Sequence, residues 1–213
     1  MKRVLIIIVS LVVLSCTDKK DIPIPENAIT AKCEKIIISD SFDFPIPAIN
    51  FIISFKNNSN QEIKLFNNTL RKSDAYFQAG VLLKSSETVT PIGAFGISNY
   101  LRLKPYSKTA YIFSYSKQHP GKWLIANRTG RKALLDFTNK VTLNYHYEEK
   151  INEYLAKTEN KNDRENSMRT KDLNYSFQAG KDFTILKDNP LIEFDNILNI
   201  DTLMKTCRQY EQK

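Results

Sequence analysis

The sequence predicts a mainly β protein, an antiparallel β-sandwich followed by a C-terminal hairpin and helix. Two observations support this fold class. Apolar and polar residues alternate through much of residues 32–147, and turn-forming residues separate the alternating runs. Alternation with a period of two is expected of strands with one buried and one solvated face. Many short strands without intervening helical segments favour an antiparallel sandwich.

The clearest alternation lies in residues 141–148, and four shorter runs repeat it. The apolar positions of these runs are Val141, Leu143, Tyr145 and Tyr147; Phe51, Ile53 and Phe55; Ile63 and Leu65; Leu101 and Leu103; and Tyr111, Phe113 and Tyr115. Ile52 breaks the alternation. Residues 36–38 are three consecutive isoleucines, and such an uninterrupted apolar run indicates a central strand.

Three stretches rich in Asn, Ser, Pro or Gly separate the strands, at residues 57–60, 104–107 and 119–121. These residue types favour tight reversals of the backbone. A strand, an Asn-rich turn, a second strand and a Leu-Lys-Pro turn before an aromatic strand follow one another. This order resembles immunoglobulin-like modules of bacterial cell-surface proteins. The chain lacks the Cys-Trp-Cys core of antibody domains, and Trp123 follows a Pro-Gly turn instead.

The C-terminal third changes character. Residues 149–172 are rich in charges of both signs and predict a solvated loop or insertion. Two apolar runs, 173–177 and 183–186, flank Gly180 and predict a hairpin. After Pro190 the apolar residues follow helical spacing, with Asp201 near the expected helix start. Residues 173–213 are therefore expected to form a hairpin and a helix packed on the sandwich.

The first residues, MKRVLIIIVSLVVLSC, have the three parts of a secretion signal: Lys2 and Arg3, an apolar run, and Ser15-Cys16. The run is too short for a spanning helix of about 20 residues. The segment 13–16 resembles the lipobox of bacterial lipoproteins. That resemblance implies that residues 1–15 are removed and that Cys16 carries acyl chains such as palmitate. The alternative is a soluble secreted protein with a chance cysteine at its cleavage site.

Residues 16–30 predict a tether, because Pro23 and Pro25 favour an extended backbone. The sandwich is then expected in residues 31–148. Thr17 rather than Asp follows the cysteine, and by analogy with enterobacterial lipoproteins this implies the outer membrane. The charged residues after Cys16 resemble the leaders of Bacteroidota surface lipoproteins. Whether the protein faces the periplasm or the cell surface stays open.

Composition and charge argue against a nucleic-acid partner. The formal net charge is +8, but lysine dominates over arginine and the charges are spread along the chain. Forked contacts to phosphate favour arginine in a patch, so no nucleic-acid partner is expected.

Catalytic and metal-binding motifs are not recognisable in the sequence. The two histidines, His119 and His146, are far apart and have no cysteine pair nearby, so no metal site is expected. Neither a Gly-x-Ser-x-Gly nucleophile motif nor a Gly-rich phosphate loop is present. We expect a non-enzymatic protein without a cofactor.

Two cysteines remain once Cys16 is assigned to lipid. Cys33 and Cys207 lie at the two ends of the folded part, where a disulfide would close a long loop. Two separate buried thiols are the alternative, and the sequence does not decide between them.

Aromatic residues near the turns are candidates for a binding surface, namely Tyr100, Tyr106 and Trp123. Tyr145 and Tyr147 alternate along a strand and are expected in the core. The resulting hypothesis is an outer-membrane lipoprotein that acts as a non-enzymatic binding or accessory module. It would contact the membrane through Cys16 and recognise another envelope protein or a glycan. The alternatives are a periplasmic immunity lipoprotein that neutralises a toxin and a carbohydrate-binding surface lipoprotein.

Overall fold

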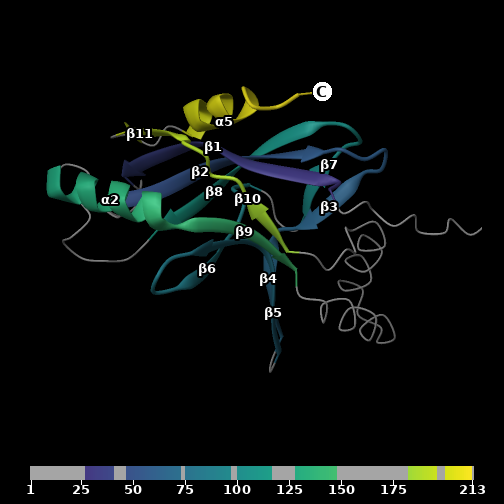
Figure 1. Cartoon of the computed structure of the whole chain (residues 1–213), viewed down its shortest axis with the longest axis horizontal. Helices are drawn as coiled ribbons and strands as arrows, with labels where there is room; N and C mark the ends of the chain where they lie inside the picture. The colour runs from purple at the N-terminus through teal and green to yellow at the C-terminus, as the bar shows by residue number, and fades with distance from the viewer. Residues whose placement is uncertain are drawn as a thin grey trace, which may run out of the picture.

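The structure, a computed structural model, describes residues 27–40, 47–72, 75–96, 100–116, 128–147, 182–195 and 200–212. Within these ranges the chain is mainly β, with two helices (Figure 1). Most strand pairs are antiparallel. The predicted fold class is confirmed, including the C-terminal helix.

The first sheet has the strand order β11-β1-β2-β8. Its strands are β1 (Ile29–Asp40), β2 (Pro47–Asn57), β8 (Lys108–Ser116) and β11 (Leu191–Asp195). β1 pairs with β2 and β2 with β8 in antiparallel fashion, whereas β11 joins β1 in parallel. β1 is therefore an interior strand, as the apolar run at residues 36–38 predicts.

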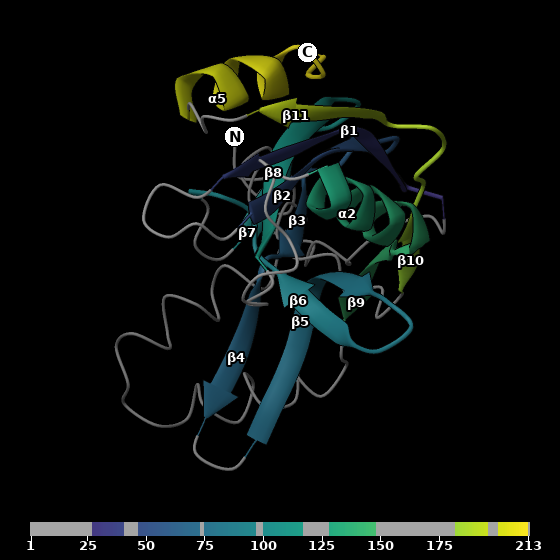
Figure 2. The ribbon, with the colours of Figure 1, turned by 90° about the vertical axis from the view of Figure 1, so that its left-hand side faces the viewer.

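The second sheet has the order β10-β9-β5-β4, and β6 pairs with the second half of β5. Its strands are β4 (Asn68–Lys72), β5 (Ala75–Lys84), β6 (Val89–Ile92), β9 (Thr142–Tyr147) and β10 (Phe183–Ile185). A separate antiparallel pair consists of β3 (Ile63–Phe66) and β7 (Tyr100–Leu103). Figure 2 shows β4 and the first half of β5 as a hairpin that projects from the body.

Two helices pack against the first sheet. α5 (Ile200–Arg208) lies over its outer face (Figures 1 and 2). α2 (Arg128–Lys140) lies near one end of the sheet. Phe137 of α2 stacks on Tyr115 of β8, with ring centroids 5.5 Å apart. Arg131 places its guanidinium 5.4 Å from the ring centre of Phe194 in β11.

Apolar clusters cover both faces of the first sheet. The larger cluster lies between the sheets and includes Ile36, Phe51 and Phe113. The smaller cluster includes Ile37 and Ile52 and lies beneath α5. Ile52 breaks the alternation along β2 because α5 covers the face that solvent would otherwise reach.

Residues 182–195 cross from one sheet to the other. β10 first pairs with β9 in the second sheet. Leu186 then exchanges two backbone hydrogen bonds with β1. The amide of Cys33 donates to the carbonyl of Leu186 at 2.7 Å, and the amide of Leu186 donates to the carbonyl of Ala31 at 2.9 Å. β11 continues along β1 beyond a bulge between Cys33 and Lys35. This one segment therefore supplies an edge strand to each of the two sheets.

Several boundaries differ from the sequence-based expectations. β1 begins at Ile29 and Ala28 is buried, so the body starts before residue 30, where the predicted tether ends. The sequence pattern does not predict α2, whose only fully buried apolar side chain is Leu134. It also does not predict the parallel pairing of β11. Residues 149–172 and the first arm of the predicted hairpin, 173–177, lie outside the described residues.

Leu203 tests whether α5 belongs to the cooperative fold. This side chain is 6% exposed and packs in the cluster beneath the helix. We expect Leu203→Ala to lower the free energy of unfolding by about 2–4 kcal/mol, because it leaves a cavity in a packed apolar site. Urea denaturation measures the change. Lys205→Ala on the exposed side of the same helix is the matched control, and an equal effect of both changes would contradict the packing.

Candidate functional site

The turn between β7 and β8 presents Tyr106 to solvent. Its side chain is 67% exposed, more than any other large apolar or aromatic side chain of the described residues. Its φ angle is 53°, in the left-handed region that non-glycine residues rarely adopt. Such a conformation costs free energy and is found more often at functional positions. Because the ring contributes nothing to the core, Tyr106 is a candidate for contact with a partner.

Asn57, at the end of β2, holds this turn in place. The residue is fully buried. Its side-chain amide donates to the carbonyls of Leu103 and Lys104, both at 3.1 Å, and to that of Gln61 at 2.6 Å. Its side-chain oxygen accepts hydrogen bonds from the amide and hydroxyl of Ser59, at 2.9 and 2.7 Å. One side chain therefore joins the loop after β2 to the turn before β8.

Backbone hydrogen bonds reinforce this connection. The amide of Tyr106 donates to the carbonyl of Ser59 at 3.1 Å, and the amide of Asn57 donates to the carbonyl of Ser107 at 2.9 Å. The hydroxyl of Ser107 donates to the carbonyl of Lys104 at 2.8 Å. The Tyr106 turn is thus a rigid part of the body.

The chain enters the body at the same end. The amide of Asn58 donates to the carbonyl of Ala28 at 2.7 Å. Its side-chain amide donates to the hydroxyl of Thr30 at 2.9 Å and to the carbonyl of Asn27 at 3.3 Å. This end is the right-hand one in Figure 1, where β3 and β7 lie. We call it the entry end, defined by Asn27, residues 57–62 and residues 104–108.

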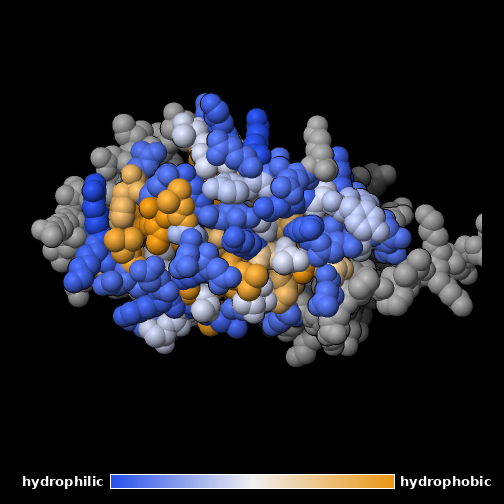
Figure 3. All heavy atoms as spheres, turned by 45° about the horizontal axis from the view of Figure 1, so that its top comes forward, coloured by the Kyte–Doolittle hydropathy of each residue, from blue (hydrophilic) through white to orange (hydrophobic). Residues whose placement is uncertain are grey.

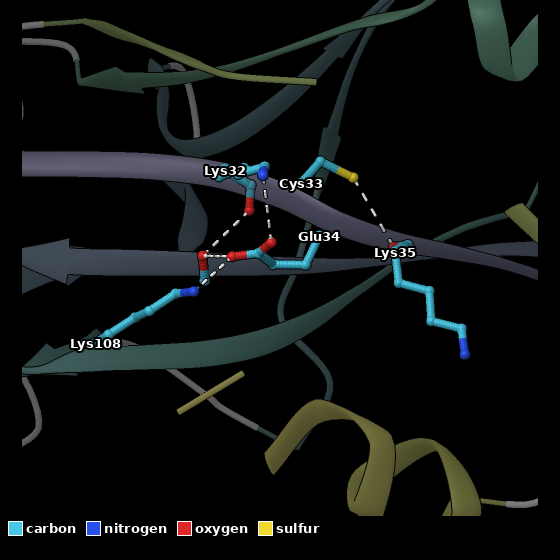
Figure 4. A network of polar contacts seen from close by, with 6 residues as sticks. Lys32, Cys33, Glu34, Lys35 and Lys108 are labelled. Carbon is cyan, nitrogen blue, oxygen red and sulfur yellow. Dashed lines mark hydrogen bonds and ion pairs between the residues drawn. The ribbon is translucent and has the colours of Figure 1, made fainter. Parts of the chain in front are cut away.

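A polar network lies on the outer face of the first sheet near the entry end (Figure 4). Glu34, whose side chain is 10% exposed, follows Cys33 at the bulge of β1. Its carboxylate lies 2.7 Å from the ammonium of Lys108 on β8 and accepts a 2.7 Å hydrogen bond from Ser54 on β2. The ammonium of Lys32 lies 3.8 Å from the same carboxylate. The network therefore connects three neighbouring strands.

Glu34 is ionised in this network. Burial alone would raise the pKa of its carboxyl, but hydrogen bonds from Lys108 and Ser54 and the charges of Lys108 and Lys32 outweigh burial and lower the pKa below 4.5. A lowered pKa contributes stability above the unfolded-state value, and this contribution is lost as the pH falls. Because one carboxylate contacts both cations and the Ser54 hydroxyl, the arrangement stabilises the pairing of the three strands.

Lys187 forms a second polar cluster, at the C-terminal end of α2. Its ammonium donates to the backbone carbonyls of Thr138, Asn139 and Val141. A cation at this position satisfies the last carbonyls of a helix and complements its dipole. A cavity of about 360 Å³ lies beside the cluster, lined in part by Thr138, Lys187 and Pro190. The three donors of the ammonium are already used, so the cluster is a helix cap and not an anion site.

Cys33 and Cys207 are both free and buried. They lie in the two different apolar clusters, on opposite faces of the first sheet. The disulfide that the sequence left open is therefore absent, and the alternative of two separate thiols holds. Burial raises the pKa of Cys33 to about 12 and that of Cys207 to about 11, so both thiols are protonated and unreactive at neutral pH.

The structure places the other strand aromatics and the described histidine in structural roles. Tyr145 and Tyr147 are buried, as predicted. The hydroxyl of Tyr145 accepts a hydrogen bond from the amide of Phe66 at 2.9 Å, and its ring stacks on Phe183. His146 lies on the polar side of β9, with Nδ1 2.8 Å from the carboxylate of Asp182.

The other sequence-predicted site residues lie partly or wholly outside the described part of the chain. Tyr100 lies in β7, paired with Phe66 of β3, and its side chain is not among those described. Cys16, His119 and Trp123 lie outside the described residues. Of the three candidate binding residues, only Tyr106 is therefore placed as an exposed side chain.

In the described part of the chain, no group of three or more His, Cys, Asp or Glu side chains is arranged to hold a metal ion. Within the same ranges, no helix has the length and apolarity needed to span a bilayer.

Comparison with known proteins adds no relative. The chain matches no family model, no curated protein and no solved structure.

Asn57, Glu34 and Lys187 are the residues of these sites that the sequence reasoning missed. Asn57 stood in a predicted turn, where its residue type already explained its presence. Glu34 contacts β8 and Lys187 contacts the end of α2, and both partners lie far away in the sequence. The residues next to Glu34 and Lys187 give no indication of these contacts.

Asn57 supports the first test of the site. We expect Asn57→Ala to lower the free energy of unfolding by about 3 kcal/mol, because it leaves several buried backbone and hydroxyl groups without partners. Asn58→Ala is the control, since that side chain is exposed and its loss is expected to cost less than about 1 kcal/mol. Denaturant titrations compare the two. Equal losses would show that Asn57 does not organise the turn.

The raised pKa of the Cys33 thiol predicts that the free energy of unfolding declines at alkaline pH. The pKa of this thiol is raised from 9 to about 12, so the folded state keeps a proton that the unfolded state releases. Stability is full below pH 9 and falls as the pH rises toward 12, by about 1.4 kcal/mol per pH unit for this group. Denaturation across this range should show a shallower decline for Cys33→Ala than for the unchanged chain. Identical slopes would contradict the raised pKa.

Proposed function

We propose that the protein is a lipid-anchored envelope lipoprotein whose β-rich body acts as a non-enzymatic binding or accessory module. One observation carries the proposal. Before the body, a short apolar run typical of a secretion signal is followed directly by Ser15 and Cys16. Stable anchoring takes more than one acyl chain or a second membrane contact. The outer membrane is the proposed location, by analogy with lipoproteins that lack Asp after the cysteine.

The described body is compatible with a role in binding. The side chains of Asn57, Glu34 and Lys187 serve structural hydrogen bonds or ion pairs, and the two described thiols are protonated. The exposed surface offers a rigidly held tyrosine at the entry end. A larger apolar area lies toward the opposite end (left in Figure 3). Among the exposed apolar side chains of the described residues are Leu191 at the start of β11 and Ile200 at the start of α5. Such areas favour contact with another protein.

Lipidation is tested at Cys16. We expect the unchanged chain to incorporate labelled palmitate and to fractionate with membranes when it is expressed in a bacterium. Cys16→Ala should abolish the incorporation, because the thiol is the acceptor, whereas Thr17→Ala should not. Mass spectrometry of the mature chain locates the acyl groups.

A second arm separates anchoring from folding. A chain whose residues 1–16 are exchanged for an ordinary cleavable signal should be soluble in the periplasm and show an unchanged β-type circular dichroism spectrum. A chain that stays membrane-bound after this exchange, or that never carries an acyl group, would overturn the lipoprotein proposal.

A further inference from the structure

We propose that the entry end of the body rests on the bilayer that holds the anchor, with Tyr106 among the lipid headgroups. The inference rests on the proposed anchoring through Cys16 and names the surface that the exposed tyrosine contacts. Its partner is a phospholipid surface that includes anionic lipids.

Chain length sets the geometry. Eleven residue steps separate Cys16 from Asn27, and fully extended chain covers at most about 3.6 Å per step, or about 40 Å. Asn27 lies at the entry end, through its contact with Asn58. β1 has 12 residues and, at about 3.3 Å per residue, carries the chain about 40 Å away from that end. An anchor at Cys16 therefore keeps the entry end within about 40 Å of the membrane, whereas the far end of β1 can lie about twice as far away.

The chemistry of Tyr106 fits a headgroup layer. A tyrosine ring has an apolar body and a hydroxyl tip, and tyrosines are enriched where bilayers meet water. The ring is 67% exposed at the tip of a turn, in a backbone conformation that glycine would adopt at lower cost. The coloured residues at the right-hand end of the face drawn in Figure 3 are mostly hydrophilic. The ring therefore suits shallow contact and not deep insertion.

The charges at the entry end favour an anionic surface. Lys104 is an exposed cation of the entry end, and Lys56, Arg102 and Lys32, the last also 3.8 Å from Glu34, are exposed cations in the adjoining strands. The exposed carboxylates are Glu62 and Glu211, while Glu34 is held by Lys108. Each basic residue near an anionic leaflet contributes about 1 kcal/mol of attraction. The excess of positive charge and the tyrosine thus act on the same side of the body.

The rigidity of the turn lowers the cost of contact. Asn57 and the backbone bonds to Ser59 and Ser107 already fix residues 104–107. A surface that is ordered before binding loses less conformational entropy on contact. This contact would supply the second interaction that stable anchoring needs.

The experiment measures whether residue 106 meets lipid in the anchored protein. Tyr106→Trp, purified with its acyl groups, is reconstituted into vesicles of phosphatidylcholine and phosphatidylglycerol with or without brominated acyl chains. We expect brominated lipid to quench the added fluorescence. Val89→Trp is the matched control, since Val89 is 54% exposed on β6, away from the entry end, and should not be quenched. The unchanged chain gives the background from Trp123.

A second measurement uses the lipid-free chain that starts at Thr17. We expect weak binding to the same vesicles, lost when salt rises from about 0.15 M to about 1 M. Lys104→Gln should weaken this binding about fivefold, which corresponds to about 1 kcal/mol. Lys84→Gln, an exposed lysine on β5, should leave it unchanged. Tyr106→Gly should also weaken this binding. Because glycine adopts the left-handed φ at lower cost, weaker binding of this variant would not reflect misfolding.

The outcomes are separable. Quenching at residue 106 but not at residue 89 supports the inference. Equal quenching at both positions, or none at residue 106 in a protein that remains anchored, overturns it and leaves the lipoprotein proposal intact. Lack of acylation overturns both. Binding of Tyr106 to a glycan or a partner protein, without quenching in vesicles, would also overturn the inference.

Discussion

The fold depends on one short segment, residues 182–195, which bonds to elements far from it in sequence. Phe183 stacks on Tyr145 in the second sheet at 4.8 Å, and Leu186 forms two backbone hydrogen bonds with β1 in the first. Between these contacts and β11, Lys187 donates to the carbonyls at the end of α2. A half-buried ammonium is costly unless its donors are satisfied, and here three carbonyls satisfy them. The two sheets and α2 are therefore fixed relative to one another by successive residues of a single segment.

The outer face of the first sheet is divided into zones that specify strand register. Asn50 bonds to Ser39 and accepts from Ser114, which links β1, β2 and β8 toward one end. α5 covers the apolar middle, and the Glu34 network links the same three strands toward the entry end. A register slip of one residue would move these polar groups to the apolar face, where they would lose their partners. Burial and polar bonding thus favour the same pairing.

Local patterns in the sequence predict the strands but not how they are joined. The alternation at Tyr145 and Tyr147 predicts a strand with one buried face. The apolar run at residues 36–38 predicts that β1 is a central strand. The parallel partner of β1 is not predicted in this way, because the short alternation of residues 192–195 does not specify which strand they pair with, and that strand lies more than a hundred residues earlier in the chain. The exposure of Tyr106 follows from its Pro-containing turn. Its left-handed backbone and its dependence on Asn57 arise from contacts between two loops and carry no local signal.

The late position of β11 has a consequence for how the chain reaches this structure. β1 is made first and carries the most apolar run of the body, yet its outer edge has no partner until residues 186–195 have left the ribosome. Pairings between distant segments form slowly, and open apolar edges invite association with other chains. The nascent protein is therefore expected to depend on holding factors until synthesis is nearly complete, and a chain that stops before Leu186 would leave that edge permanently open.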